Sequence, residues 1–505
     1  MNTNHILITR HILITRRLRY VMGMVALMLA TVGCEKYLDE PVYSEMDPET
    51  LLATEAGVNS LLNSTFGELL LRGWDGKSRM NLENWCTDIE WETGGGENLI
   101  ATQMINFTWD ASLASNWLND ILWLRPYRAI RNANLLLENI DRGAYDASRK
   151  AIYMAEARFM RALAYTKLYA WFGPVPLRTS SDDPLELGRP TDDAMKAFIE
   201  GELQAVSSEL PIPGDEANYG RPNRGGALAL LCKFYLNTKQ WEKVVATADN
   251  IIALNKYQLY PEYGQLFRVE NERNAEYILV FPQSPQTGGN SYINGAFPPG
   301  FQRDPVLGLD FRSGWQNWAA QYRLYDSFYN SFHATDKRKD VIMTSYINGA
   351  GQTISLLNND DTRSIKFWPD PDAIVNEHGN DLPEIRYADI LLAKSEALAE
   401  LNWPSQEAID LVNRVRERAG LIGDNAIALA DFSNLQAFRD HLLNERAWEF
   451  YSEAGIRRED LIRFGKFVSS AHARGKTNAR ETHQLFPIPQ AAMDADPSLE
   501  QNDGY

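Results

Sequence analysis

The fold is decided by residues 153–172, whose sequence is YMAEARFMRALAYTKLYAWF. Apolar and small side chains recur along this stretch at three- and four-residue spacing, as expected of an amphipathic helix that buries one face. Gly173 and Pro174 follow directly. A glycine in a left-handed conformation and a proline that cannot continue the helix together end it. The stretch therefore predicts a long helix with a sharp C-terminal stop.

Similar amphipathic stretches recur in pairs along the rest of the chain. Residues 226–237 and 241–254 form one predicted pair, and residues 383–401 and 405–419 form another. Each pair spans about 30–40 residues, the length typical of tetratricopeptide-like repeats. Two further pairs are expected within residues 49–140 and 150–210. We therefore predict a mainly α fold with about four helix pairs.

Between residues 281 and 375 prolines and glycines replace the helical pattern. A long irregular stretch of this kind is often functional when it is ordered, so we expect it to form the ligand-binding side. A short helix is expected to return over residues 319–328. The predicted organisation is a single domain over 49–505, with an N-terminal half at 49–255 and a C-terminal helical part at 383–505.

The first 33 residues differ from the rest of the chain. They carry four arginines and no acidic residue, and an apolar run over residues 21–32 leads to Cys34. This pattern is typical of a secretory signal, and the run is shorter than the roughly 20 residues that cross a bilayer. The sequence TVGC resembles a bacterial lipobox, with Thr31 where leucine is usual. We expect removal of residues 1–33, acylation of Cys34 and a tether at 34–48.

The charge of the chain limits its partners. The formal net charge is −17, and it becomes more negative once the four leader arginines are removed. Nucleic acid is excluded because its phosphates require a basic surface. Polyanionic ligands are disfavoured unless a local basic patch outweighs the background, which is screened over about 8–10 Å.

Aromatic residues outside the helical pattern gather in two regions. Trp74 and Trp91 lie among glycines in the first region, and Trp315 lies in the Gly/Pro-rich segment. Rigid rings pack against the C–H face of a pyranose, while polar side chains at the edge bind its hydroxyls. The alternative is that these rings pin long loops to the scaffold. The predicted ligand-binding residues are Trp74, Asp88, Glu90, Trp91, Asn98, Tyr292, Asn294, Trp315 and Trp318.

The mature sequence lacks the motifs of common metal and nucleophile sites, such as His-Glu-x-x-His, Cys-x-x-Cys and Gly-x-Ser-x-Gly. Asp88, Glu90 and Glu92 are similar to the acids of a glycosidase cleft. Such acids, however, flank the bond from two sides about 5–10 Å apart, which three acids on one loop do poorly. We predict no enzyme activity, no metal and no cofactor.

Cys86 and Cys232 are expected to be buried thiols, and a disulfide between them is the alternative.

Several segments, in order along the chain, resemble one family, the SusD/RagB outer-membrane lipoproteins. The resemblance rests on CEKYLD at 34–39, RFMRALAY to FGPVPL at 158–177, RYADILL at 386–392 with NRVR at 413–416, ER to RFG at 445–465, LFPIP at 485–489 and QNDGY at 501–505. Asp503 stands where proline is common in the family. Together these segments span nearly the whole mature chain.

The resemblance implies a tetratricopeptide scaffold with an irregular ligand-binding side. It implies a partner as well, a SusC-like TonB-dependent barrel on which the lipoprotein sits as a lid and to which it delivers oligosaccharides. It places the ligand site in loops after the first long helix and in the segment before Ala319. We therefore expect a lipid-anchored glycan-binding protein at the outer membrane, facing the cell exterior. The alternatives are a peptide receptor of the RagB type, a glycoside hydrolase and a protein scaffold.

Overall fold

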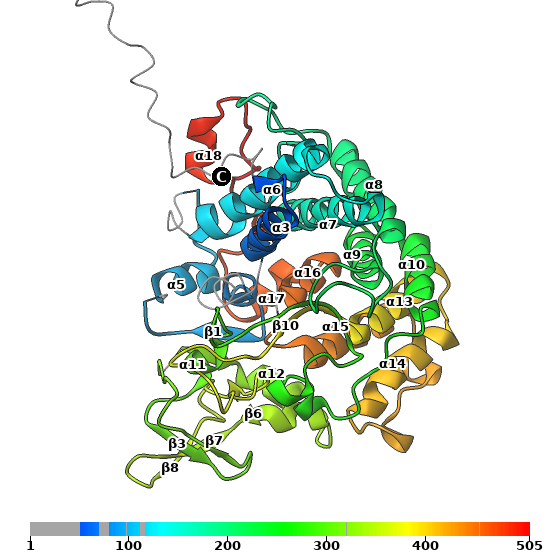
Figure 1. Cartoon of the computed structure of the whole chain (residues 1–505). Helices are drawn as coiled ribbons and strands as arrows, with labels where there is room; N and C mark the ends of the chain where they lie inside the picture. The colour runs from blue at the N-terminus through cyan, green and yellow to red at the C-terminus, as the bar shows by residue number, and fades with distance from the viewer. Residues whose placement is uncertain (1–50, 70–79, 97, 112–116, 320, 454) are drawn as a thin grey trace, which may run out of the picture. The chain divides into compact units, whose positions relative to one another are not determined.

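Long helices lie side by side and carry an irregular, strand-containing segment (Figure 1). The computed structural model describes residues 51–69, 80–96, 98–111, 117–319, 321–453 and 455–505. Residues Leu52–Tyr505 form one compact unit. The leader, Cys34 and Trp74 lie outside the described residues. No helix in the described part of the chain is long and apolar enough to cross a membrane.

Eight helices pack as four successive pairs, which confirms the predicted tetratricopeptide-like arrangement. The pairs are α3 (Glu55–Leu69) with α6 (Arg125–Asn139), α7 (Ala147–Phe172) with α8 (Asp192–Glu209), α9 (Arg224–Asn237) with α10 (Trp241–Ala253), and α13 (Tyr387–Leu401) with α14 (Gln406–Arg418). Each pair also packs on the next one, so the apolar faces merge into one continuous core. Cys86 and Cys232 are buried in this core as free thiols, as predicted.

Helix α7 ends at Phe172 as its sequence predicts, but it begins at Ala147, before the predicted start at residue 153. The Asp146 carboxylate accepts a bond of 2.9 Å from the Arg149 backbone N–H and caps the N-terminus. Gly173 adopts φ 72° and ψ −152° and donates its N–H to the Tyr169 carbonyl at 2.9 Å. Because L-residues rarely adopt this conformation, glycine is needed to end the helix here.

The prediction of a helix over 383–401 was wrong at its start. Residues Leu382–Arg386 form strand β10, which pairs antiparallel with β2 (Tyr277–Phe281), and α13 begins only at Tyr387. All five residues of β10 are buried, including Glu384 and Arg386. These two charged side chains are tolerated in the interior because each forms ion pairs there. Glu384 pairs with Lys167, and Arg386 pairs with several glutamates. Such long-range partners are invisible to helical periodicity.

The helix expected over 319–328 was also wrong. Residues Tyr322–Leu324 form strand β5, and the helix α12 spans Asp326–Ser331. Ala319 has φ 51°, a left-handed conformation that interrupts a helix. Cross-strand pairing therefore overrides the local pattern here.

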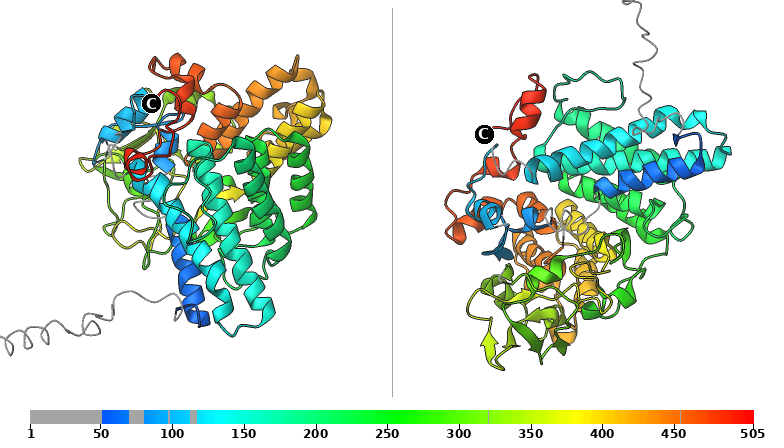
Figure 2. Two further views of the ribbon diagram at one scale, coloured as in Figure 1. Left: turned by 90° about the horizontal axis from the view of Figure 1, so that it is seen from above. Right: turned by 60° about the vertical axis from the view of Figure 1, so that its left-hand side comes forward.

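The other strands of the irregular segment form two small sheets. One has the order β4 (Leu309–Asp310), β3 (Phe301–Asp304), β7 (Ser345–Asn348), β8 (Thr353–Ser355), and the other pairs β6 (Ile342–Met343) with β9 (Arg363–Ser364). Figure 2 shows these strands away from the four helix pairs. A cluster of aromatic rings, Phe297, Phe301, Phe311 and Trp315, gives the segment a core of its own. This core orders a stretch that has little regular secondary structure.

The remaining helices complete the chain. They are α5 (Asn98–Asn106), a π-helical segment at Trp117–Leu124, α11 (Tyr292–Ala296), α15 (Leu435–Phe450), α16 (Ile456–Arg463), α17 (Phe467–Ala473) and α18 (Gln490–Ala495). Short 3-10 helices lie at Ile140–Arg142, Tyr263–Gln265, Val269–Asn271, Lys337–Val341, Gly423–Asn425, Leu429–Asp431 and Glu481–Gln484.

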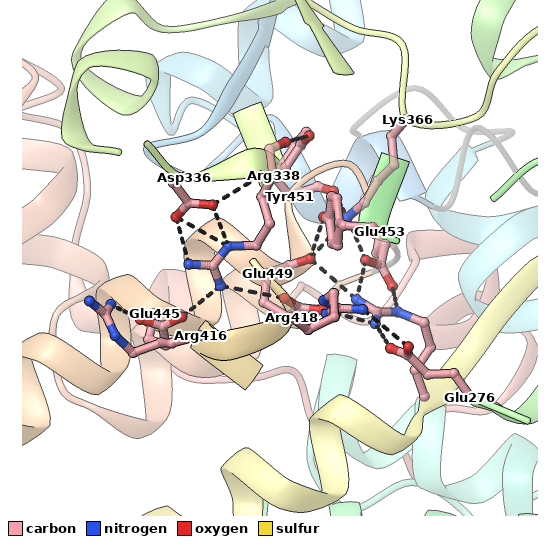
Figure 3. Close-up of polar contacts among 12 residues, drawn as sticks. Glu276, Asp336, Arg338, Lys366, Arg416, Arg418, Glu445, Glu449, Tyr451 and Glu453 are labelled. Atoms are coloured by element: carbon pink, nitrogen blue, oxygen red, sulfur yellow. Dashed lines mark hydrogen bonds and ion pairs between the residues drawn. The ribbon is translucent and has the colours of Figure 1, made fainter. Parts of the chain in front are cut away.

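A network of buried charges joins the irregular segment to the C-terminal helices (Figure 3). Its cations are Arg338, Lys366, Arg386, Arg416 and Arg418, and its anions are Glu276, Asp336, Glu445, Glu449 and Glu453. All ten side chains are buried. The five positive and five negative charges cancel, which is the condition under which burial of so many ions is tolerated.

Glu449 on α15 is the centre of this network. Its carboxylate lies 3.0 Å from Arg386 and 3.4 Å from Arg338, and it also pairs with Arg418. Burial acts to raise the pKa of Glu449, but these guanidinium groups outweigh it and hold that pKa below its ordinary value. Because its partners come from β10, α14 and the 336–338 segment, Glu449 fixes the irregular side to the helical scaffold.

Candidate functional site

Strand β1 (Glu90–Glu92) pairs antiparallel with β5, and this pairing places Trp91 opposite Arg323. Side chains alternate between the two faces of a strand. The two glutamates of β1 are accordingly buried, whereas Trp91 between them is half-buried and faces outward. The two sequence regions that were predicted as the ligand side thus meet in one small sheet.

The Trp91 ring is held in place from several directions. Its indole N–H donates to the Asp360 carbonyl at 2.9 Å, and the Arg323 guanidinium lies 5.0 Å from its ring centre. The Tyr325 ring lies nearly parallel to it, with the centroids 6.1 Å apart and the planes inclined by 16°. Two half-buried rings with nearly parallel planes form an aromatic platform whose geometry is fixed before any ligand arrives.

Charged groups surround the two rings. Asp361 forms an ion pair with Arg323 at 3.1 Å, and Asp360 and Asp326 each bind the backbone N–H of the other, at 2.8 and 2.9 Å. The Arg474 guanidinium lies 5.7 Å from the centre of the Tyr325 ring. Such an edge of carboxylates and guanidinium groups suits hydroxyl-rich ligands. We name Trp91, Arg323, Tyr325, Asp360 and Asp361 the Trp91 surface.

The loop after β1 lies against the start of β5. Gly95 has φ 76°, and a Cβ atom added there would lie 2.0 Å from the side-chain nitrogen of Gln321. Asn98 is exposed at the start of α5, and Trp318 is half-buried, with its backbone N–H bonded to the Asn294 carbonyl at 2.9 Å. Asn98 and Trp318, two of the predicted ligand-binding residues, are therefore not fully buried.

Other predicted ligand-binding residues are placed differently. Glu90 is 2% exposed, and its carboxylate accepts from Asn84 at 3.1 Å, from the Tyr292 hydroxyl at 3.2 Å and from Ser452. Burial raises the pKa of Glu90. Asp88 accepts two bonds of 2.7 Å from the Arg457 guanidinium. These contacts support a structural role for Asp88, Glu90 and Tyr292.

Asn294 and Trp315 are buried as well and hold the loop at 370–378. The Asn294 amide donates to the Asn376 carbonyl at 2.8 Å, and its oxygen lies 3.2 Å from the His378 ring nitrogen. The Trp315 indole donates to the Asp370 carbonyl at 2.9 Å. Their contacts correspond to the alternative stated for the aromatic residues, namely that they fix loops to the scaffold.

Sequence patterns did not indicate Arg323, Tyr325, Asp360 or Asp361. The expected helix over 319–328 obscured the first two, because a helix does not present them beside Trp91. The two aspartates reach the surface only through pairing of β5 with residue 362, where the Leu324 N–H donates to the Thr362 carbonyl at 2.8 Å. No short-range signal in the sequence reveals such a contact.

The acids of β1 do not form an open hydrolytic pair. Glu90 and Glu92 are each 2% exposed and face the interior. A glycosidase needs two carboxyl groups on opposite sides of a bound sugar. Among the described residues, no group of three or more His, Cys, Asp or Glu side chains is arranged to hold a metal ion.

Relatives of the chain are SusD-like proteins. SusD-like protein P25 of Formosa agariphila is 26% identical over 530 residues, covering 96% of this chain and 98% of the relative. SusD-like protein P2 of the same organism is 23% identical over 433 residues, covering 80% of this chain and 82% of the relative.

Solved structures share the fold along most of the chain. A laminarin binding SusD-like protein has a TM-score of 0.74 at 22% identity, covering 90% of this chain and 100% of its own. Surface glycan-binding protein A from Bacteroides thetaiotaomicron, in complex with laminarihexaose, has a TM-score of 0.72 at 20% identity, covering 89% and 99%. At these identities the likeness shows the fold.

Two family models divide the chain between them. Residues 36–236 match the model described as "Starch-binding associating with outer membrane", and residues 237–505 match the model of the SusD family. The second match alone covers more than half of the sequence. The chain therefore belongs to the SusD family.

Proposed function

We propose that this protein captures glycans at the cell surface through the Trp91 surface and passes them to a transporter without chemical change. The observation that carries the proposal is the aromatic platform of Trp91 and Tyr325 with its charged edge. A pyranose packs its C–H face on such rings, and its hydroxyls bind the carboxylate and guanidinium groups beside them. The glycan-binding names of structural relatives support this ligand class.

The mechanism is binding and release. A shallow platform suits micromolar to millimolar affinity, about −4 to −8 kcal/mol, and binding of this strength lets the ligand leave quickly. The rings keep their positions through the indole bond to Asp360 and the Arg323 guanidinium, so little ordering is required when a sugar binds. The burial of Glu90 and Glu92 supports a role without catalysis.

Membrane anchoring and a transporter partner complete the proposal. Acylation of Cys34 holds the protein at the outer membrane, facing outward, beside a SusC-like TonB-dependent barrel. The lipobox-like sequence at 31–34 and the outer-membrane description of the matched family support this cellular location. Tethering raises the local concentration of a modest binder next to the pore that takes its ligand.

The test is a panel of affinity gels and titrations with the full chain in detergent. Laminarin, starch, xylan and galactan are compared with casein-derived peptides as the rival ligand. Retention by at least one neutral glycan is expected. Retention of peptides alone identifies a peptide receptor and contradicts the proposal, as does release of shorter sugars from the gel. A pull-down of a TonB-dependent barrel from native membranes tests the partner separately.

A further inference from the structure

A cavity separate from the Trp91 surface lies beside strand β2. Its volume is about 830 Å³, within the range of ligand sites in proteins. The loop between α8 and α9, the residues after α10 and the residues before β2 enclose it. It shares no residue with the Trp91 surface. A ligand in this cavity would therefore contact a different set of side chains from a ligand on the Trp91 surface.

The charge of this cavity is opposite to that of the chain. Its lining includes the cations Arg221, Lys256 and Arg273 but only one acid, Glu216, whereas the whole chain carries −17. Arg221 is paired with Glu156. Among the described residues no carboxylate forms an ion pair with Lys256 or Arg273, and both side chains are exposed. The side chains of Lys256 and Arg273 are therefore available to bind an anionic group of a ligand.

Arg273 is positioned in this cavity by contact with an aromatic ring. Its guanidinium lies 4.9 Å from the ring centre of Tyr219, and its backbone adopts φ 59°, which non-glycine residues rarely do. Tyr219 is fixed in turn, because its hydroxyl donates to Asp381 at 2.7 Å. Glu272 and Asp381 interact electrostatically with Arg273, and burial raises the pKa of Glu272 to about 8 and that of Asp381 to about 6. The Asp381 carboxylate also accepts hydrogen bonds from the Tyr219 hydroxyl and the Gln283 backbone N–H. Glu272 is therefore largely uncharged at neutral pH.

The remaining lining matches a saccharide better than a simple anion. The half-buried rings of Tyr219 and Tyr257 provide apolar walls, and the side chain of Asn218 is exposed at the rim. A sugar unit offers a C–H face to the rings and hydroxyls to the amide. A carboxylate on the same unit binds Lys256 and Arg273 through charge-assisted hydrogen bonds.

We infer that this cavity is a second glycan site that binds acidic sugar units, of the uronic acid class. The inference rests on the proposed function only in that it takes a glycan as the ligand. A polymer with both neutral and acidic units engages the two sites at once, and the second contact raises retention without new affinity at either site.

The test is calorimetric titration of the full chain in detergent with trigalacturonate and with neutral galactotriose. The parent is expected to bind the acidic trimer at least about tenfold more tightly than the neutral one, a difference of about 1.4 kcal/mol. Lys256→Glu and Arg273→Gln are expected to weaken trigalacturonate binding about tenfold each. Lys239→Glu is the control, because it makes the same charge change at an exposed site outside the cavity.

Three outcomes overturn the inference. They are no binding of trigalacturonate, equal binding by the parent and the two cavity variants, and equally tight binding of a hexaglutamate peptide, which shows attraction by charge alone. Binding of neutral glycans by the same variants is measured in parallel. A loss there points to the Trp91 surface and the proposed function, so the two failures are distinguishable.

Discussion

At the scale of single residues, Asp88 and Trp91 lie close in sequence but have different contacts. Asp88 is tied to Arg457, a guanidinium that is 6% exposed. Trp91 keeps part of its ring open to solvent. Stability should therefore depend on Asp88, and ligand affinity on Trp91.

Asp88→Asn is expected to lower the free energy of unfolding by about 2–3 kcal/mol, because it leaves the buried Arg457 without its charged partner. Glycan affinity is expected to stay unchanged. Urea denaturation gives the first quantity and titration the second. Weaker glycan binding with unchanged stability would show instead that Asp88 touches the ligand.

The sequence identified only part of the candidate surface. Trp91 was predicted because it lies beside a run of glycines, and the structure places it in strand β1 with its ring half-buried. Glu90 and Tyr292 have residue types common in binding sites, and only burial of the pair shows that they face inward. Arg323 and Asp360 depend on strand register and backbone contacts, which a residue pattern does not encode.

At the scale of elements, two neighbouring glycines in the loop between β1 and α5 should differ in how well they tolerate substitution by alanine. Gly95→Ala introduces a Cβ that overlaps the Gln321 side chain at a backbone φ of 76°. A cost of about 1–2 kcal/mol is expected, with weaker glycan binding because the loop moves away from β5.

Gly96→Ala is the matched control, since a Cβ there has no heavy atom within 4 Å. It is expected to change the free energy of unfolding by less than about 0.5 kcal/mol. Thermal unfolding and glycan titration of both variants provide the comparison. Equal behaviour of the two would mean that the contact between this loop and Gln321 does not order the surface.

Helices were easier to predict than strands for a physical reason. The buried residues of α10 and α14 repeat every three to four residues, so each of these helices is encoded locally. Strands β5 and β10 are short and pair with partners far along the chain, and their side chains are satisfied by distant charges. The helical scaffold was therefore predictable, and the side that carries the site was predictable only as an irregular segment.

At the scale of the whole molecule, the buried charge network should dominate stability. Glu449→Gln leaves the surrounding guanidinium groups with an unbalanced positive charge and is expected to cost about 3–5 kcal/mol. Glu407→Gln is the control, because Glu407 pairs with Lys394 at the surface and its side chain is 56% exposed. A cost under about 1 kcal/mol is expected there. Urea denaturation of both variants that gave equal losses would contradict this role of the network.

Acid should weaken the same network and also the ion pairs of Asp460 with Arg446 and Arg463. The guanidinium groups around Glu445, Glu449 and Asp460 outweigh burial and hold the pKa of each carboxyl below its ordinary value. Their contribution is present above the unfolded pKa of about 4 and is lost as pH falls through the lower folded values. Asp381 has the opposite sign: burial raises its pKa to about 6, so its contribution to stability is present below about pH 4 and is lost as pH rises from about 4 to 6.

The raised pKa values of Glu90, Glu272 and Asp381 affect stability only above about pH 4, so below that pH the lowered carboxyls dominate. The free energy of unfolding is therefore expected to fall as pH drops from about 4 toward 2. Chemical denaturation across this pH range, repeated with Glu449→Gln, provides the measurement. A variant with the same acid dependence as the parent would show that Glu449 does not contribute to it.

The central claim is that the platform of Trp91 and Tyr325 binds the glycan. The most direct test is titration of the best-retained neutral glycan into the parent, Trp91→Ala and Trp241→Ala, the last being a half-buried tryptophan on α10. The account predicts that Trp91→Ala loses about tenfold or more in affinity, about 1.4 kcal/mol, while Trp241→Ala binds like the parent. Equal affinity of Trp91→Ala and the parent, with both folded, would contradict it.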